Sequence, residues 1–126
     1  MSRKKSYSDK DGSGRYQGTS ENPEIACGFP GCKKVASARS LIDLHHIKPI
    51  CMGGSDLAYN RMWVCPDHHR RIFVPDCPSG HHSIKHLDSI IVIGYLNSSV
   101  GRVLHFVDPS GVERYWAYRN GDFLWK

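Results

Sequence analysis

Short apolar stretches alternate with polar and glycine-rich segments along the whole chain. In the first half, "SLIDLHHIKPI" and "YNRMWV" are separated by "MGGSD". The apolar stretches are typical of short strands and the glycine pair of a turn, so we predict an antiparallel strand pair. A helix is expected next, over 66–74, because Pro66 suits the first helical position, Asp67 complements the positive end of the helix dipole, and Pro75 blocks continuation.

The last third of the chain has the pattern of a small antiparallel sheet. The candidate strands are "SIIVIGYL", "GRVLHFV", "VERYWAY" and "DFLWK". The second and third are joined by "DPSG", a turn sequence, and the last two by Asn120 and Gly121, the preferred pair of a two-residue hairpin. Alternating aromatic residues on this hairpin are expected to pack across strands more readily than to stack on bases: Tyr115, Trp116, Tyr118, Phe123 and Trp125.

These elements divide the chain into four segments. Residues 1–24 are rich in Ser, Gly, Lys and Arg and almost without aliphatic residues, so we expect a disordered basic tail. Residues 25–75 form a compact module, 76–87 a loop, and 88–126 an antiparallel sheet packed on the module. The expected fold class is α+β.

Length and charge narrow the class of partner. The chain has 126 residues, a net charge of +5 and a pI of about 9.0. Positive charge favours a polyanionic partner such as nucleic acid, although a soluble protein that is merely basic would have the same charge.

No apolar stretch is long enough to span a bilayer and the N-terminus lacks a secretory signal, so a cytoplasmic protein without a membrane partner is expected.

Cysteine and histidine spacing predicts a structural zinc site. Four residues separate Cys27 from Cys32, and His68 follows Cys65 by three positions at the start of the expected helix. Residues three apart on a helix share a face, so both pairs can reach one metal as a Cys3His site. The alternative is buried cysteines beside an incidental histidine. Four protein ligands leave a zinc ion no open position, so this zinc would stabilise the fold and not act as the catalyst.

The two remaining cysteines and the histidines of the following loop are less informative. An odd cysteine count argues against a disulfide framework. Cys51 and Cys77 then have no predicted role as zinc ligands. The loop histidines His81, His82 and His86 could form a further metal site with Cys77. They lack paired ligand spacing, so we expect DNA contact or solvent exposure for them instead.

A second constellation comprises His45, His46, Asn60 and His69. His69 lies one residue beyond a zinc ligand, which on a helix turns its side chain about 100° away from that ligand. Adjacent strand residues such as His45 and His46 point to opposite faces, so one can bind a metal while the other stays free as a candidate general base. The plainer alternative is one buried and one exposed histidine, with Asn60 as an ordinary turn residue.

The order of these motifs resembles the HNH endonucleases, also called ββα-metal or His-Me finger nucleases. The resemblance comprises Cys27-x4-Cys32, "DLHHIKP", "GGSDLAYN" and "VCPDHHRRI", with Asn60 fourteen residues after His46 and nine before His69. It covers about residues 25–74. It implies a zinc-stapled ββα-metal module carrying the appended sheet, and an enzyme that hydrolyses phosphodiester bonds of DNA.

The resemblance also implies a role for each residue. His46 would be the general base that activates water, and Asn60 would orient His46. His45 and His69 would bind a divalent ion, Mg²⁺ or Mn²⁺, at the scissile phosphate and the leaving 3′ oxygen. Some branches of the family have a further metal-binding histidine where this chain has Phe73, which argues for a loosely held, hydrated ion; with two imidazole ligands, Mn²⁺, Ni²⁺ or Co²⁺ are alternatives to Mg²⁺.

Nucleic-acid contacts are expected around this site from Lys48, Arg70 and Arg71, with a solvated helix face as the alternative for Arg71. DNA is the expected partner, RNA is not excluded, and a double-strand cut would need a homodimer or larger assembly. The rival interpretation is a zinc-stabilised nucleic-acid-binding module without physiological cleavage.

Overall fold

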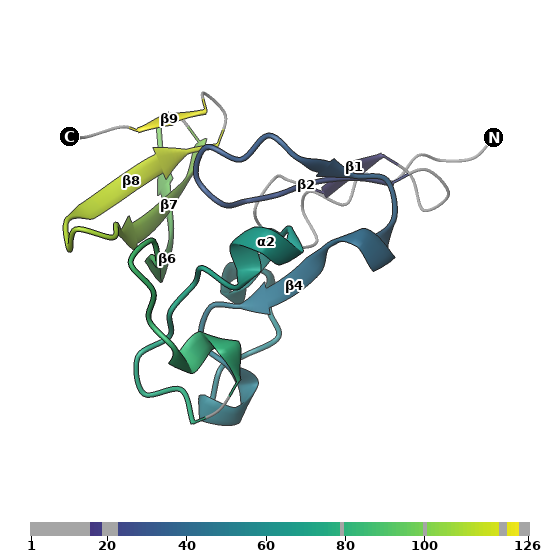
Figure 1. The fold of residues 1–126 in the computed structure, drawn as a ribbon. Coiled ribbons are helices and arrows are strands. Elements are labelled where there is room, and N and C mark those ends of the chain that lie inside the picture. Colours follow the sequence, from purple (N-terminus) through teal and green to yellow (C-terminus); the bar gives the residue numbers. More distant parts are fainter. Residues whose placement is uncertain (1–15, 19–22, 79, 100, 119–120, 124–126) are drawn as a thin grey trace.

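The structure is a computed structural model that describes residues 16–18, 23–78, 80–99, 101–118 and 121–123. Within them the chain mixes helix and strand and forms small antiparallel sheets with strand orders β1-β2-β3, β4-β5 and β6-β7-β8-β9 (Figure 1). The strands are β1 Tyr16–Gly18, β2 Pro23–Ala26, β3 Val35–Ala36, β4 Asp43–His46, β5 Arg61–Val64, β6 Ile91–Ser98, β7 Gly101–Val107, β8 Glu113–Ala117 and β9 Asp122–Phe123. The helices are α2 Pro66–His69 and the 3-10 turns η1 Arg39–Leu41, η2 Ile50–Met52, η3 Ala58–Asn60 and η4 His81–Ser83.

The predicted strand pair is present as β4 and β5. They are antiparallel, with His45 opposite Met62 and His46 opposite Arg61. The connection between them turns at the glycine pair as expected, since Gly53 has a φ of +91°. Any side chain at Gly54 would collide with the backbone carbonyl of Lys48, so this tight turn requires glycine there.

The predicted helix over 66–74 is wrong in its extent, because α2 ends at His69. Beyond it the chain leaves the helical path to pair with the start of the last sheet, in an isolated parallel bridge between Ile72 and Ile90. The Phe73 N–H donates to the Ile90 carbonyl at 2.8 Å, and the Ile90 N–H donates to the Arg71 carbonyl at 2.9 Å. These long-range bonds replace the helical bonds that local sequence signals predict.

The four strands expected in the last third are present as β6 to β9. β7 has the predicted bounds, β6 lies two residues later than predicted, and β8 is one residue shorter at each end. In the "DPSG" turn the Gly111 N–H donates to the Asp108 carbonyl at 2.9 Å, and the Asp108 carboxylate accepts the N–H groups of Ser110 and Val112. Asn120 and Trp125 lie outside the described residues. Trp116 contacts Phe123 edge-on across β8 and β9, with ring centroids 4.9 Å apart, so cross-strand packing of the aromatics is confirmed for this pair.

The main core joins the last sheet to the first half of the chain. Its buried residues come from the loop before β3, the residue after β4, β5, the start of α2 and the segment after it, and the region of the last sheet: Cys27, Phe29, Ile47, Met62, Val64, Cys65, Ile72, Val74, Ile90, Val92, Leu104, Phe106 and Tyr118. Two tyrosine hydroxyls add polar links, Tyr95 to the Arg61 carbonyl and Tyr118 to the Gly28 carbonyl, both at 2.9 Å. The sheet therefore packs on the region that carries the candidate site.

The disordered tail expected over 1–24 is wrong at two places, since β2 already begins at Pro23. Tyr16–Gly18, expected in the disordered tail, forms β1 and pairs with β2. Residues 1–15 and 19–22 lie outside the described part of the chain. No helix among the described residues is long and apolar enough to cross a membrane.

Candidate functional site

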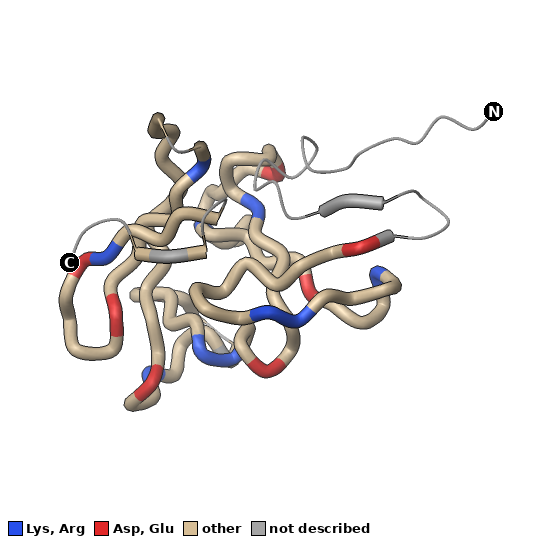
Figure 2. The backbone as a smooth tube through the Cα atoms, turned by 90° about the horizontal axis from the view of Figure 1, so that it is seen from above, with Lys and Arg blue, Asp and Glu red and all other residues tan. Residues whose placement is uncertain are grey.

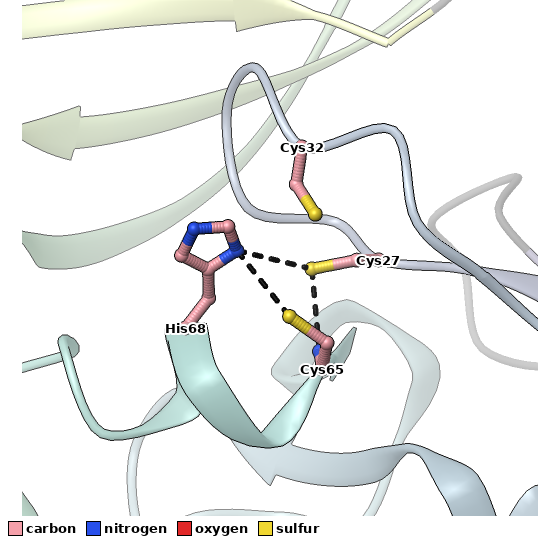
Figure 3. Close-up of side chains that lie close together, drawn as sticks. All are labelled: Cys27, Cys32, Cys65 and His68. Atoms are coloured by element: carbon pink, nitrogen blue, oxygen red, sulfur yellow. Dashed lines mark hydrogen bonds between the residues drawn. The ribbon is translucent and has the colours of Figure 1, made fainter.

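Cys27, Cys32, Cys65 and His68 form one group, as the sequence predicts (Figure 3). Two cysteines lie on the loop between β2 and β3, while Cys65 and His68 lie at the start of α2. The four ligand atoms all lie within 4.8 Å of one another, with His68 Nδ1 3.4 Å from the sulfur of Cys65. A Cys3His group of this kind could hold a metal such as zinc.

The surroundings of this group support ligation. The N–H groups of Phe29 and Cys65 point at the Cys27 sulfur, at 3.5 and 3.2 Å, and the His68 ring stacks on Phe29 with centroids 4.2 Å apart. Burial raises the pKa of the Cys27 thiol to about 12. Such a thiol ionises at neutral pH only where a cation compensates its charge, and a bound metal ion would do so.

A second group consists of His45 on β4, His69 on α2 and His82 on η4. The Nε2 atom of His69 lies 3.3 Å from Nδ1 of His45 and 3.0 Å from Nε2 of His82. One ring nitrogen of each histidine lies within 4.8 Å of the other two, so this group too could hold a metal ion. His45 is almost completely buried, and the other two are partly buried.

The other ring nitrogens show which atoms are available as ligands. His69 Nδ1 lies 2.9 Å from a carboxylate oxygen of Asp43, and His82 Nδ1 lies 2.8 Å from the Ile72 carbonyl oxygen. Carboxylate and carbonyl oxygens only accept, so each Nδ1 carries the proton and each Nε2 presents a lone pair. Two lone pairs 3.0 Å apart repel each other unless a proton or a metal ion lies between them. This arrangement, with oriented imidazoles, is typical of metal sites.

Sequence reasoning missed His82, for which it expected DNA contact or solvent exposure. His82 reaches the site because the Ile72–Ile90 bridge closes the intervening segment into a loop, and the Val74 N–H donates to the His82 carbonyl at 2.9 Å. No fixed spacing in the sequence predicts such a ligand. The only sequence signal for it is Phe73, which stands where some branches of the resembled family have a further metal-binding histidine. Nearby, His86 is exposed and Cys77 is packed against the main core.

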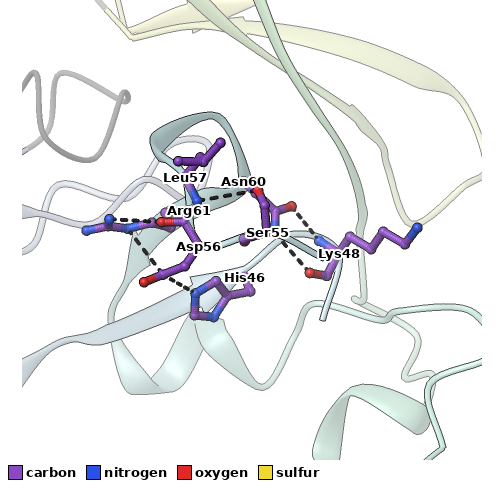
Figure 4. Close-up of polar contacts among 7 residues, drawn as sticks. All are labelled: His46, Lys48, Ser55, Asp56, Leu57, Asn60 and Arg61. Atoms are coloured by element: carbon purple, nitrogen blue, oxygen red, sulfur yellow. Dashed lines mark hydrogen bonds and ion pairs between the residues drawn. The ribbon is translucent and has the colours of Figure 1, made fainter. Parts of the chain in front are cut away.

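His46 points away from His45, as strand geometry predicts. Its Nε2 lies 2.8 Å from a carboxylate oxygen of Asp56 (Figure 4). That hydrogen bond holds the pKa of the Asp56 carboxyl below its ordinary value, so Asp56 is ionised at neutral pH and accepts from Nε2. The ring then carries its proton on Nε2 and leaves Nδ1 as the basic nitrogen.

His46 and the three-histidine group share one pocket of about 280 Å³. Its lining residues are Leu44, His45, His46, Pro49, Ile50, His69 and His82. An imidazole and a group of possible metal ligands that line one cavity can contact one bound molecule.

Asn60 is buried and fixes the loop between β4 and β5 (Figure 4). Its side-chain oxygen accepts the Lys48 N–H at 2.8 Å, and its side-chain nitrogen donates to the carbonyls of Lys48 and Ser55 at 3.0 and 2.7 Å. The Asn60 carbonyl also accepts the Ile47 N–H at 2.9 Å. These hydrogen bonds act on His46 only through the backbone of the residues that follow it, Ile47 and Lys48.

The three cations expected to contact nucleic acid differ in their surroundings. Lys48 and Arg70 are exposed. Arg71 lies 3.0 Å from Asp88 in an ion pair, and its guanidinium lies over the Phe29 ring at 5.3 Å, so packing occupies it. Basic and acidic positions are interspersed over the described backbone instead of forming one large basic face (Figure 2).

No family model matches the chain, and neither the curated proteins nor the solved structures contain a match to it.

Proposed function

We propose that the chain is a metal-dependent endonuclease with a ββα-metal core of the HNH type, built from β4, β5 and α2, that hydrolyses DNA. The observation that carries the proposal is the shared pocket in which three imidazole nitrogens converge while His46 stays outside their group. A protein that only binds nucleic acid has no need of a basic imidazole beside a second metal group.

In this proposal His45, His69 and His82 hold the divalent ion. When bound, it would stabilise the charge that develops on the scissile phosphate and on the leaving 3′ oxygen. Three imidazoles are a softer ligand set than the two expected from sequence, which favours Mn²⁺, Ni²⁺, Co²⁺ or Zn²⁺ over Mg²⁺. Asp43 and the Ile72 carbonyl orient two of the three rings.

His46 has the role of general base. Nδ1 takes a proton from the attacking water while Asp56 holds the ring through Nε2 and stabilises the imidazolium that forms. Asn60 keeps the following backbone in place, and exposed Lys48 and Arg70 are available to neighbouring phosphates. The expected products are a 5′-phosphate and a 3′-hydroxyl.

The test is a supercoiled-plasmid nicking assay on protein whose Cys3His group is loaded with zinc. We expect nicking that requires added Mn²⁺, Ni²⁺, Co²⁺, Zn²⁺ or Mg²⁺ and that stops with chelator. Binding of DNA without cleavage under any of these ions would favour the rival function, a zinc-stabilised nucleic-acid-binding module. Cleavage of equal rate with and without metal would contradict the proposed chemistry.

A further inference from the structure

Arg61 and His46 lie directly opposite each other at one end of the β4–β5 ladder. Residues paired in this way in an antiparallel sheet project from the same face, with their Cβ atoms about 5 Å apart. The Arg61 side chain is 23% exposed, and the Arg61 carbonyl accepts the hydroxyl of Tyr95 on β6 at 2.9 Å. Arg61 is therefore well anchored beside the proposed general base.

Asp56, the carboxylate that contacts His46, has no comparable support from burial. Its side chain is 72% exposed. An exposed ion pair or hydrogen bond competes with water and has to restrict the rotamers of the side chains that make it, so each such contact is weak by itself. The contact with His46 alone would therefore leave the Asp56 carboxylate poorly ordered, and a second contact is needed to hold it in place.

Arg61 makes that second contact in two ways (Figure 4). Its Nη1 donates to the Asp56 backbone carbonyl at 3.3 Å, and its Nε lies 4.0 Å from Asp56 Oδ1. This is the same oxygen that lies 2.8 Å from Nε2 of His46. Arg61 Nε is buried and has no hydrogen-bond partner among the described residues, which favours a closer approach of the carboxylate. Arg61 thus holds the backbone of Asp56 and attracts its charge.

Resting on the proposed function, we propose that Arg61 is a positioning residue that keeps the Asp56 carboxylate on Nε2 of His46, so that Nδ1 stays free to accept the proton of water. Without Arg61 the carboxylate spends more of its time in water, and the ring loses the acceptor that fixes its own proton on Nε2. The fraction of correctly oriented His46 then falls. Binding of DNA is unaffected, because Arg61 acts through Asp56 and not on the substrate.

The test measures kcat and KM for cleavage of a duplex oligonucleotide by the full chain, loaded with zinc and an activating divalent ion. Arg61→Met keeps the aliphatic part of the side chain but removes its charge and its N–H donors. We expect it to lower kcat about tenfold with KM unchanged, within the range of coupling between contacting residues. Arg61→Lys keeps the charge and should lose less.

A double-mutant cycle distinguishes positioning through Asp56 from a merely structural role. Asp56→Ala, at an exposed side chain, should leave the fold intact and lower kcat by a similar factor. In the Asp56→Ala background, Arg61→Met should cause little further loss, because its effect requires the carboxylate. Arg114→Met is the matched control: Arg114 lies 2.7 Å from Asp108 in an ion pair outside the pocket, and its replacement should leave kcat unchanged.

Three results would overturn the inference and leave the nuclease function standing. They are a wild-type kcat in Arg61→Met, full multiplication of the two losses in the double variant, and a rise in KM alone, which would show that Arg61 contacts the DNA. If Arg61→Met does not fold, Arg61→Lys takes its place in the cycle. Absence of cleavage by the wild type overturns the proposed function and this inference with it.

Discussion

The Nε2 atoms of His69 and His82 lie 3.0 Å apart, although the two residues are 13 positions apart in the chain and belong to different elements. The Nδ1 atom of each ring is hydrogen-bonded to an oxygen, so the facing atoms are lone-pair donors. Their approach is unfavourable unless a proton or a metal ion lies between them. This pair is the strongest reason to expect His82 as a third ligand of the ion that the family resemblance places on His45 and His69.

Replacement of His82 should therefore remove the second metal ion without affecting the first. We expect zinc-loaded wild-type protein to bind one further Mn²⁺ or Ni²⁺ ion in a calorimetric titration, and His82→Ala to lose that binding event. His86→Ala is the matched control, because His86 lies in the same loop but is exposed and outside both groups. Equal second-site affinity in His82→Ala and wild type would show that the third ligand is misassigned.

Asp43 should affect the same site more weakly, since it orients His69 and is not one of the grouped ligands. Asp43→Asn should weaken second-site metal affinity by about 10–100-fold, the range typical of residues that orient a ligand. The same titration measures it. A loss of second-site binding as complete as in His82→Ala would indicate that Asp43 itself binds the ion.

Zinc removal should unfold the region around α2. The Cys3His group joins the loop before β3 to α2, and most of the binding free energy at such sites is folding free energy. We expect a chelator to abolish the cooperative thermal transition, and Cys32→Ser to lower the midpoint even with zinc in excess. An unchanged transition in metal-free protein would contradict a structural zinc.

Cys51→Ser is the control for that experiment. Cys51 is exposed and outside the group, so the free energy of unfolding should change by no more than about 0.5 kcal/mol.

The contrast between the two metal groups shows what local sequence can predict. Cys27 and Cys32 share one loop, and Cys65 and His68 share one helical turn, so short spacing fixes how each pair points. The opposite orientations of His45 and His46 likewise follow from strand geometry. Inferences of this kind depend on neighbours in the chain, and the structure agrees with them.

What sequence could not predict depends on contacts between distant residues. The sequence correctly predicts that a helix begins at Pro66. Pairing of the following segment with Ile90 ends α2 at His69 and takes Phe73 out of the helical path. The same pairing brings His82 to the site. Pairing of Tyr16–Gly18 with β2 is also non-local, and the polar composition around β1 gave no sign of it.

Substitution of Asn60 should lower the stability of the protein, whereas substitution of His46 should lower its activity with little loss of stability. Asn60→Ala removes three partly buried hydrogen bonds to the backbone of Lys48 and Ser55, which should cost about 3 kcal/mol of unfolding free energy in urea denaturation. His46→Ala, at a partly exposed side chain, should cost less than about 1 kcal/mol. The assignment of Asn60 as a loop-fixing residue fails if Asn60→Ala unfolds like wild type.

The most direct test of the central claim is the plasmid nicking rate of His46→Ala under conditions where wild type and variant carry equal measured amounts of both metals. We expect the rate to fall by about 10²–10⁴-fold, the usual contribution of a general base, with metal affinity unchanged. His105→Ala, at a partly buried histidine paired with Glu113 outside the pocket, should cut like wild type. Equal rates for His46→Ala and wild type would contradict the account.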